Sequence, residues 1–391
     1  MAKVLISDKL NKLAVEIFEK NEIEVDFKPG LSPEELADII GDYDGLAIRS
    51  ATKVTEDIFA KADNLKVVGR AGIGVDNVDI KAATAKGVVV MNTPFGNSIT
   101  TAEHAIAMMF ALARQIPQAN ESTHAGKWEK SKFMGTELYA KTLGIIGCGN
   151  IGAIVADRAI GLEMDVVAFD PFLSEEKAIE LGIKKVELET LLSKADFITL
   201  HTPLNDQTRN ILNKDTLAKT KENVRIINCA RGGLINEPDL KQALDSGHVA
   251  GAALDVFEQE PAQENILFNH PNVVCTPHLG ASTTEAQVNV AIQVAEQMSD
   301  YLTTGAISNA LNMPSISAED APKLKPYMKL SEQLGSFAGQ ITENAIETVE
   351  IEYRGVVADL DTRPLSSVII AHLLKPQLDH VNMVNAMNIA S

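Results

Sequence analysis

The sequence predicts an α/β protein built on two doubly wound parallel sheets. Short apolar, β-branched segments alternate with amphipathic segments along most of the chain, and a glycine-rich turn follows one apolar segment near the middle. Polar side chains gather after the later apolar segments. Strand–helix alternation is typical of parallel sheets covered by helices on both faces. A chain of 391 residues is long enough for two or three such domains.

The first hundred residues carry five short apolar segments, each of which predicts a strand. Ser32 followed by Pro33 predicts the start of a helix, because serine caps helices and proline suits the first helical position. Strands are expected at 4–7, 25–28, 45–48, 66–69 and 88–91, and helices at 9–20, 33–40 and 55–62.

Two arginines mark a possible binding edge in this part of the chain. Arg49 and Arg70 each stand at the carboxyl end of an expected strand, where open α/β sheets bind ligands. Each could be a solvated surface charge, but together they predict two guanidinium groups that face an anionic substrate. Gly72, Gly74 and Asn97 in the following loops offer backbone and amide donors.

The central glycine-rich turn predicts a dinucleotide site. An expected strand at 142–146 leads into Gly147, Gly149 and Gly152, which have the G-x-G-x-x-G spacing. A glycine-rich turn alone is weak evidence, but a second expected strand, 165–169, ends in Asp170, where a ribose-binding acid belongs. No arginine follows Asp170 to hold a 2′-phosphate, so the cofactor is expected to be NAD.

The segment 100–114 predicts a long apolar helix that is buried between domains or at a subunit contact. His104 within it is expected to be a structural histidine. The segment 119–137 predicts a polar helix and an extended loop, and the single tryptophan, Trp128, is either a subunit contact or a local core anchor.

Beyond the glycine turn, strands are expected at 197–200, 225–228, 250–256 and 273–276. The loops after them hold the residues suited to hydride transfer from an alcohol. His278 is the natural base, Glu260 its orienting acid, and Arg231 a clamp for a substrate carboxylate. Each of the three, taken singly, could also be a solvated loop charge.

The last hundred residues predict a helix at 283–303, a linker at 316–327, a helix at 330–344, a half-buried strand at 347–353 and a helix at 365–374. The net charge of −18 argues against nucleic-acid or anionic-membrane partners. Cys148, Cys229 and Cys275 form no disulfide or metal pattern, so no metal is expected. With no signal peptide or membrane-length apolar segment, the expected location is the cytoplasm.

Several motifs resemble the D-isomer-specific 2-hydroxyacid dehydrogenases. These are the segments 228–237, 253–261 and 276–283. Within that family, segments 49–54, 69–79 and 96–98 resemble the D-3-phosphoglycerate dehydrogenases. The resemblance runs from about residue 1 to 305 and continues more weakly to about residue 380. It implies oxidation of D-3-phosphoglycerate to 3-phosphohydroxypyruvate with NAD, the first step of phosphorylated L-serine biosynthesis.

The resemblance also implies roles for particular residues. Arg231, Glu260 and His278 would form the catalytic constellation. Cofactor contacts beyond the three glycines would fall on Asn150, Ile151, Asp170, Thr202, Cys229, Ala230, Asp255, Gly280 and Ala281. Substrate contacts would fall on Arg49, Ser50, Arg70, Gly72, Gly74 and Asn97.

The domain organisation follows from the same resemblance. A Rossmann NAD-binding domain, 97–282, is inserted in a flavodoxin-like substrate-binding domain made of 1–96 and 283–308. The stretch 309–391 is a linker with an incomplete regulatory-type segment, too short for a serine-sensing domain. A homodimer or homotetramer is expected, with dimerisation through the nucleotide domain.

One departure from the family pattern is Asn150, which stands where many relatives have arginine beside the pyrophosphate. Two other functions stay open on the sequence. One is reduction of another 2-oxoacid, such as hydroxypyruvate, glyoxylate or 2-oxoglutarate. The other is an NADH-sensing binding protein like the transcriptional corepressors that share this fold.

Overall fold

The computed structural model describes residues 1–316, 319–342, 344–378 and 381–390. The chain divides into two compact units, one made of Met1–Asn97 with Thr284–Ser391 and the other of Ser98–Thr283. Each unit is built on one parallel sheet, which confirms the predicted fold class. No helix in the described ranges is both long and apolar enough to cross a membrane.

The first unit contains a five-stranded parallel sheet with strand order β2-β1-β3-β4-β5. This order reverses direction at β1, as in flavodoxin-like sheets. The expected strand positions agree with the structure to within one residue. The strands are β1 (Lys3–Ile6), β2 (Glu24–Phe27), β3 (Gly45–Ile48), β4 (Val67–Arg70) and β5 (Val89–Asn92).

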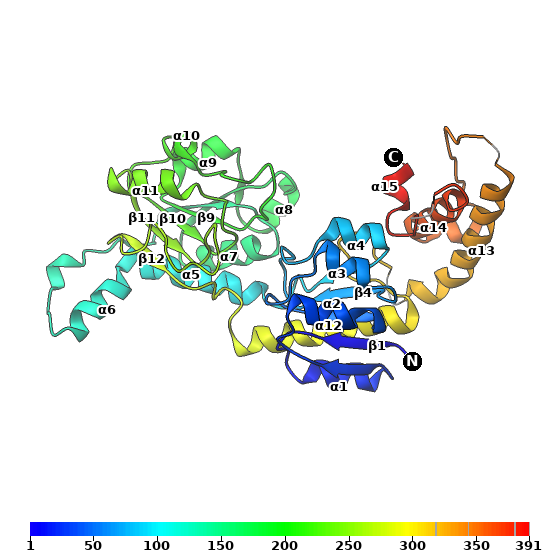
Figure 1. Cartoon of the computed structure of the whole chain (residues 1–391). Coiled ribbons are helices and arrows are strands. Elements are labelled where there is room, and N and C mark those ends of the chain that lie inside the picture. The colour runs from blue at the N-terminus through cyan, green and yellow to red at the C-terminus, as the bar shows by residue number, and fades with distance from the viewer. Residues whose placement is uncertain (317–318, 343, 379–380, 391) are drawn as a thin grey trace. The chain divides into compact units, whose positions relative to one another are not determined.

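Helices cover both faces of this sheet because its strands are apolar on both sides. One face packs against α1 (Leu13–Lys20) and the long α12 (Thr284–Thr304), which returns to this sheet from far along the sequence (Figure 1). The other face packs against α2 (Pro33–Ile39), α3 (Glu56–Lys61) and α4 (Ile80–Lys86), with a short 3₁₀ turn, η1 (Ile40–Asp42), after α2.

The start of α2 is fixed by a reciprocal cap. The Ser32 hydroxyl accepts from the Glu35 N–H at 3.2 Å, and the Glu35 carboxylate accepts from the Ser32 N–H at 2.8 Å. Pro33 occupies the first helical position, as the sequence predicts.

The second unit contains a seven-stranded parallel sheet with order β12-β11-β10-β9-β6-β7-β8. The order reverses between β6 and β9, which places the ligand crevice of a doubly wound sheet at their carboxyl ends. The strands are β6 (Thr142–Ile146), β7 (Asp165–Phe169), β8 (Lys184–Lys185), β9 (Phe197–Leu200), β10 (Val224–Asn228), β11 (Val249–Leu254) and β12 (Val273–Cys275).

Two apolar layers cover this second sheet. The helices α5 (Ser98–Arg114), α7 (Asn150–Gly161) and α8 (Glu175–Glu180) pack on one side, and α9 (Leu188–Lys194), α10 (Lys214–Leu217) and α11 (Glu237–Asp245) on the other. The remaining helix, α6 (Ile116–His124), and the loop with η2 (Lys130–Lys132) extend away from the sheet (Figure 1).

The C-terminal part corrects two predictions. Residues 320–327 of the expected linker belong to α13 (Asp320–Ile341), while residues 317–318 lie outside the described residues. Pro326 lacks an N–H donor and so costs α13 a backbone hydrogen bond. The helix tolerates it because burial of Ala321 and Leu324 in the apolar core of the first unit offsets that loss. The expected strand at 347–353 does not form, because no neighbouring strand in the described chain pairs with it.

Two glycines set the packing of this C-terminal part. α13 packs on α14 (Arg363–Leu374). A 3₁₀ turn, η3 (Gly355–Asp359), lies between these two helices in the sequence, and α15 (Ala386–Ala390) follows α14. A Cβ on Gly335 or Gly339 would lie 2.4 Å from a carbonyl oxygen of α14. The two glycines are four residues apart on one face of α13 and therefore allow close contact between the helix backbones.

Candidate active site

The glycine turn between β6 and α7 has the geometry of a phosphate cradle. Gly147 adopts φ +91°, and a Cβ there would lie 2.6 Å from the His201 carbonyl oxygen. A Cβ on Gly152 would lie 2.2 Å from the Gly147 carbonyl oxygen, so the helix start packs tightly on the turn. Gly149, by contrast, faces space with nothing within 4 Å. The backbone is therefore open to a pyrophosphate at Gly149, in front of the N–H groups of α7.

Asp170, which follows β7, is held beside this turn. One carboxylate oxygen accepts from the Cys148 N–H at 2.8 Å, and the other accepts from the Phe172 N–H at 2.8 Å. These two bonds hold the carboxylate in place beside the turn. Asp170 directly follows the next strand after the glycine turn, which is the sequence position expected for a ribose-binding acid. Burial raises the pKa of the Cys148 thiol to about 11, so that the thiol stays neutral beside the acid. The residues present therefore fit the adenosine half of NAD.

The other residues expected to contact the cofactor lie at the carboxyl edge of the same sheet. Asn150 and Ile151 are the first residues of α7, and the remainder follow four consecutive strands of the sheet order. They are Thr202 after β9, Cys229 and Ala230 after β10, Asp255 after β11, and Gly280 and Ala281 after β12.

Asp255 is the centre of a buried network at this edge. Its side chain is fully buried and accepts from the Thr276 hydroxyl at 2.6 Å and from the N–H groups of Leu279 and Gly280 at 2.7 and 2.8 Å. The His104 Nε2 lies 3.2 Å from the same carboxylate. Burial alone would raise the pKa of Asp255, but the hydrogen bonds from His104, Thr276 and Leu279 outweigh it and lower the pKa. Asp255 is therefore ionised at neutral pH.

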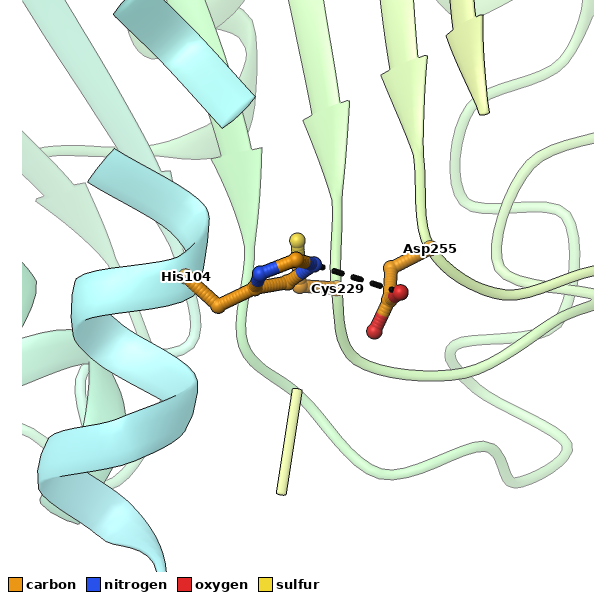
Figure 2. A group of neighbouring side chains, drawn as sticks. All are labelled: His104, Cys229 and Asp255. Carbon is orange, nitrogen blue, oxygen red and sulfur yellow. Dashed lines mark ion pairs between the residues drawn. The ribbon is translucent and has the colours of Figure 1, made fainter. Parts of the chain in front are cut away.

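His104, Cys229 and Asp255 also have the donor types of a metal site. Figure 2 shows the His104 ring extending from α5 toward Asp255, with the Cys229 sulfur beside it, and the three donor atoms lie within 4.8 Å of one another. However, the carboxylate already interacts with four donors, and burial raises the pKa of the Cys229 thiol. The group therefore has the character of a hydrogen-bond network around one negative charge.

The structure brings Glu260 and His278 together. The His278 Nδ1 lies 2.6 Å from a Glu260 carboxylate oxygen, whose other oxygen accepts from the Phe257 N–H at 3.0 Å. Burial alone would raise the pKa of Glu260, but the bonds from His278 and Phe257 lower it overall, so the carboxylate is charged and can only accept. Nδ1 must then donate, which leaves Nε2 of the half-exposed ring as a proton acceptor.

The loop that carries Arg231 packs against the segment that leads to Glu260. A Cβ on Gly232 would lie 1.8 Å from the Phe257 carbonyl oxygen, so the two backbones are in direct contact. Asn228 shapes the loop by donating to the Arg231 carbonyl at 2.8 Å and accepting from the Ala230 N–H at 3.0 Å. The Arg231 guanidinium donates to the Ala230 carbonyl at 2.6 Å. Contact of the two loops could not be read from residues so far apart in the sequence.

The residues expected to bind substrate lie in the first unit, at the carboxyl ends of neighbouring strands. β3 and β4 pair with Ile48 opposite Arg70, so Arg49 and Ser50 begin the loop beside Arg70. Gly72 and Gly74 follow β4, and Asn97 follows β5. Gly72 has φ +145°, a backbone conformation that residues with a Cβ rarely adopt, and its Cα lies against the flexible Arg70 guanidinium, so glycine is favoured there.

Two supporting residues in this unit were missed by the sequence reasoning. Asp8, almost fully buried after β1, accepts from the Arg49 N–H at 2.6 Å and from the Thr52 hydroxyl at 2.9 Å. Asn77 donates to the carbonyls of Arg49 and Thr52 at 2.7 and 2.6 Å. The available signal was the position of Asp8 directly after a strand, at the same sheet edge as Arg49. Asp8 and Asn77 fix the backbone of loop 49–52.

Comparisons with known proteins agree with this geometry. The family model described as "D-isomer specific 2-hydroxyacid dehydrogenase, NAD binding domain" matches residues 106–280. A second, described as "D-3-phosphoglycerate dehydrogenase intervening domain", matches residues 323–391. Residues 323–391 thus resemble the intervening domain of that family.

Relatives that match nearly the whole of this chain, and solved structures, indicate the same family. The chain is 49% identical to a D-3-phosphoglycerate dehydrogenase of Synechocystis sp. over 99% of this chain and 70% of that protein. It is 47% identical to the Bacillus subtilis protein of the same name, over 100% of this chain and 74% of that protein. The crystal structure of a glyoxylate reductase from Paecilomyes thermophila superimposes with a TM-score of 0.73 at 30% identity, covering 79% of this chain and 98% of that one. The chain therefore belongs to the D-3-phosphoglycerate dehydrogenases, NAD-dependent members of the D-isomer-specific 2-hydroxyacid dehydrogenase family.

Proposed function

We propose that this protein oxidises D-3-phosphoglycerate to 3-phosphohydroxypyruvate with NAD, the first step of phosphorylated L-serine biosynthesis. The observation that carries the proposal is the His278–Glu260 pair at 2.6 Å, on the same sheet edge as the glycine cradle and Asp170. Identity of 47–49% to enzymes of that name over nearly the whole chain supports this substrate. The 30% identity to a glyoxylate reductase is weaker support for that alternative.

The oxidation removes one hydride from C2 of the substrate and one proton from its hydroxyl group. NAD, which the glycine cradle and Asp170 would hold, would supply the hydride acceptor for C2 of the substrate. His278 takes the hydroxyl proton on Nε2 while its Nδ1–H donates to the Glu260 carboxylate, so the positive charge that develops on the ring is stabilised. Arg231 binds the substrate carboxylate and polarises the carbonyl that forms. In the reverse direction, His278 returns the proton to the carbonyl oxygen.

The proposal assigns recognition of the phosphate, and further contacts to the carboxylate beside that of Arg231, to residues of the first unit. Arg49 and Arg70 supply guanidinium groups, and Ser50, Gly74 and Asn97 supply further donors. Support comes from the Asp8 and Asn77 contacts, which hold loop 49–52 in one conformation. The proposed substrate-binding domain is 1–96 with 283–308, the Rossmann domain is 97–282, and 309–391 is a linker and regulatory-type segment. The compact units, which divide at Asn97 and Thr283, support these limits.

We also propose a homodimer or homotetramer, formed through the nucleotide-binding unit, in the cytoplasm. Ile116, Trp128, Met134 and Tyr139 along the extended α6 segment are 51%, 87%, 77% and 63% exposed, which favours a subunit contact and argues against Trp128 as a core anchor. Free Cys148, Cys229 and Cys275 are compatible with a reducing compartment. Light scattering of wild type and Trp128→Ser tests the assembly, and cell fractionation tests the location.

Turnover of D-3-phosphoglycerate, followed by NADH absorbance beside D-glycerate, glycolate and 2-hydroxyglutarate, tests the function. His278→Gln and Arg231→Ala should each lower kcat about 10²-fold or more. His248→Gln is a matched control, because this histidine bonds to Thr220 and Leu217 before β11, at the opposite sheet edge. Preference for another hydroxy acid would support the reductase alternative, and NADH binding without turnover would support a sensor. Site variants within about threefold of wild type would refute the assigned roles.

A further inference from the structure

One face of helix α5 contacts the loop that carries His278. The Thr101 hydroxyl donates to the Gly280 carbonyl at 2.9 Å, and the Thr100 hydroxyl lies 3.4 Å from that of Thr283. The His104 Nε2 lies 3.3 Å from the Thr276 hydroxyl and 3.2 Å from the Asp255 carboxylate. Residues three and four apart share a helix face, so these contacts form one continuous strip on α5.

The loop is held in a conformation that needs such support. His278 has φ +55°, a left-handed backbone that is unfavourable for a residue with a Cβ. Its own N–H donates to the Asp255 carbonyl at 2.9 Å. The next two N–H groups, of Leu279 and Gly280, donate to the Asp255 carboxylate. Three consecutive N–H groups at the proposed base thus depend on the position of Asp255.

The orientation of the Asp255 carboxylate in turn depends on α5. Asp255 is ionised and fully buried, so each of its oxygens needs donors. The backbone N–H groups and Thr276 all come from the loop itself and can move with it. His104 is the donor that comes from a helix, and α5 is anchored in the apolar core of the second unit. Cys229, beside the ring in Figure 2, is kept neutral by burial and adds no charge.

We propose that His104 is a positioning residue: its Nε2, 3.3 Å from the Thr276 hydroxyl and 3.2 Å from the Asp255 carboxylate, holds this bonded pair and thereby fixes the backbone of loop 276–283, which carries His278. The kinetic consequence rests on the proposed function, whereas the structural consequence does not. This role extends the site beyond the residues that face substrate or cofactor, and it adds to the structural role expected of this histidine.

Two substitutions separate the hydrogen bond from the bulk of the ring. His104→Leu fills a similar volume but removes the donor. His104→Gln keeps an N–H donor near the Nε2 position. His248→Leu is the matched control, because it removes a partly buried histidine of the same unit that bonds to Thr220 and Leu217 and not to loop 276–283.

Hydrogen exchange at the N–H groups of Leu279 and Gly280 is the first readout, measured on the protein without substrate. Loss of a hydrogen bond to a charged group should raise exchange there about tenfold or more in His104→Leu. The rate should return to within about threefold of wild type in His104→Gln and stay unchanged in His248→Leu. The second readout is kcat for D-3-phosphoglycerate, which should fall about tenfold in His104→Leu and recover in His104→Gln, while KM for the substrate changes less than about threefold.

Unchanged exchange in His104→Leu would overturn the proposal, whatever the activity. So would equal impairment of the leucine and glutamine variants, because a hydrogen bond would then not be the cause. If wild type fails to turn over D-3-phosphoglycerate while the exchange result holds, the proposed function is wrong and the positioning role stands.

Discussion

Replacement of Gly152 by alanine tests the geometric basis of the cofactor site. The new Cβ would lie 2.2 Å from the Gly147 carbonyl oxygen and 3.1 Å from its carbon. Real Cβ contacts essentially never fall below 3.0 Å, so α7 must move away from the turn by about 0.8 Å. Both neighbours are backbone of the β6–α7 turn and cannot rotate aside. Overpacking of this kind costs about 1–3 kcal/mol.

Two other glycines of the same segment complete the test: Gly161 is the matched control, and Gly149 separates an effect on cofactor affinity from an effect on stability. Gly161 lies at the end of α7 with nothing within 4 Å of a Cβ, so Gly161→Ala should be neutral or stabilise the protein by up to about 1 kcal/mol. Gly149 has φ −72° and also faces open space, so Gly149→Ala should fold normally. If a pyrophosphate approaches Gly149, the same methyl group should weaken NAD binding at least tenfold.

Urea unfolding without cofactor and calorimetric titration with NAD distinguish the three variants. Gly152→Ala should lose both stability and affinity, Gly149→Ala affinity alone, and Gly161→Ala neither. If Gly152→Ala unfolds at the wild-type urea concentration and binds NAD normally, the turn is not packed as described. Normal NAD affinity in Gly149→Ala would place the pyrophosphate elsewhere.

Three further predictions concern other parts of the chain. Asp8→Ala removes the acceptor that holds loop 49–52, so KM for D-3-phosphoglycerate should rise at least tenfold while KM for NAD stays within about threefold, as initial-rate kinetics can show. Asp255 has a pKa below its ordinary 3.8 in the folded protein, so its stabilisation is present above pH 3.8 and lost as pH falls through the lowered pKa. Asp255→Asn should therefore be less stable than wild type at pH 7. The urea unfolding midpoints of the two proteins should converge below about pH 3.8, and a difference between them that stays the same at every pH would contradict this. Gly339→Ala would put a Cβ 2.4 Å from the Leu373 carbonyl oxygen, so limited proteolysis should cleave the α13–α14 region faster without a change in NAD affinity, and an unchanged cleavage rate would show that the helices can separate freely.

Local sequence patterns were sufficient wherever the determining interactions are themselves local. The strands β6, β7 and β9 begin and end where apolar, β-branched segments predict, because buried parallel strands are apolar on both faces. The cap at Ser32 and the glycine turn at 147–152 also involve residues only a few positions apart. Parallel topology then brings all carboxyl ends to one edge, so the location of most candidate site residues followed from the strand assignments.

Patterns failed where pairing with a distant segment decides the structure. The alternating segment 347–353 resembles a strand, but a strand is stable only when a neighbour satisfies its backbone groups, and none in the described chain does so. The prolines at 322 and 326 resemble a linker, yet burial of Leu324 and contact with α14 stabilise a helix there.

The sequence by itself determined the two parallel sheets, the glycine cradle and the identities of the chemical groups at the sheet edge, because each depends on residue type and short-range spacing. Only the tertiary structure decided which of these groups meet. Glu260 reaches His278 across 18 residues, Asp8 holds Arg49 across 41, and His104 on helix α5 reaches Asp255 in the loop after strand β11. Such contacts depend on how helices and loops pack around the sheets, and this packing is set by the shape of the whole core rather than by any one segment.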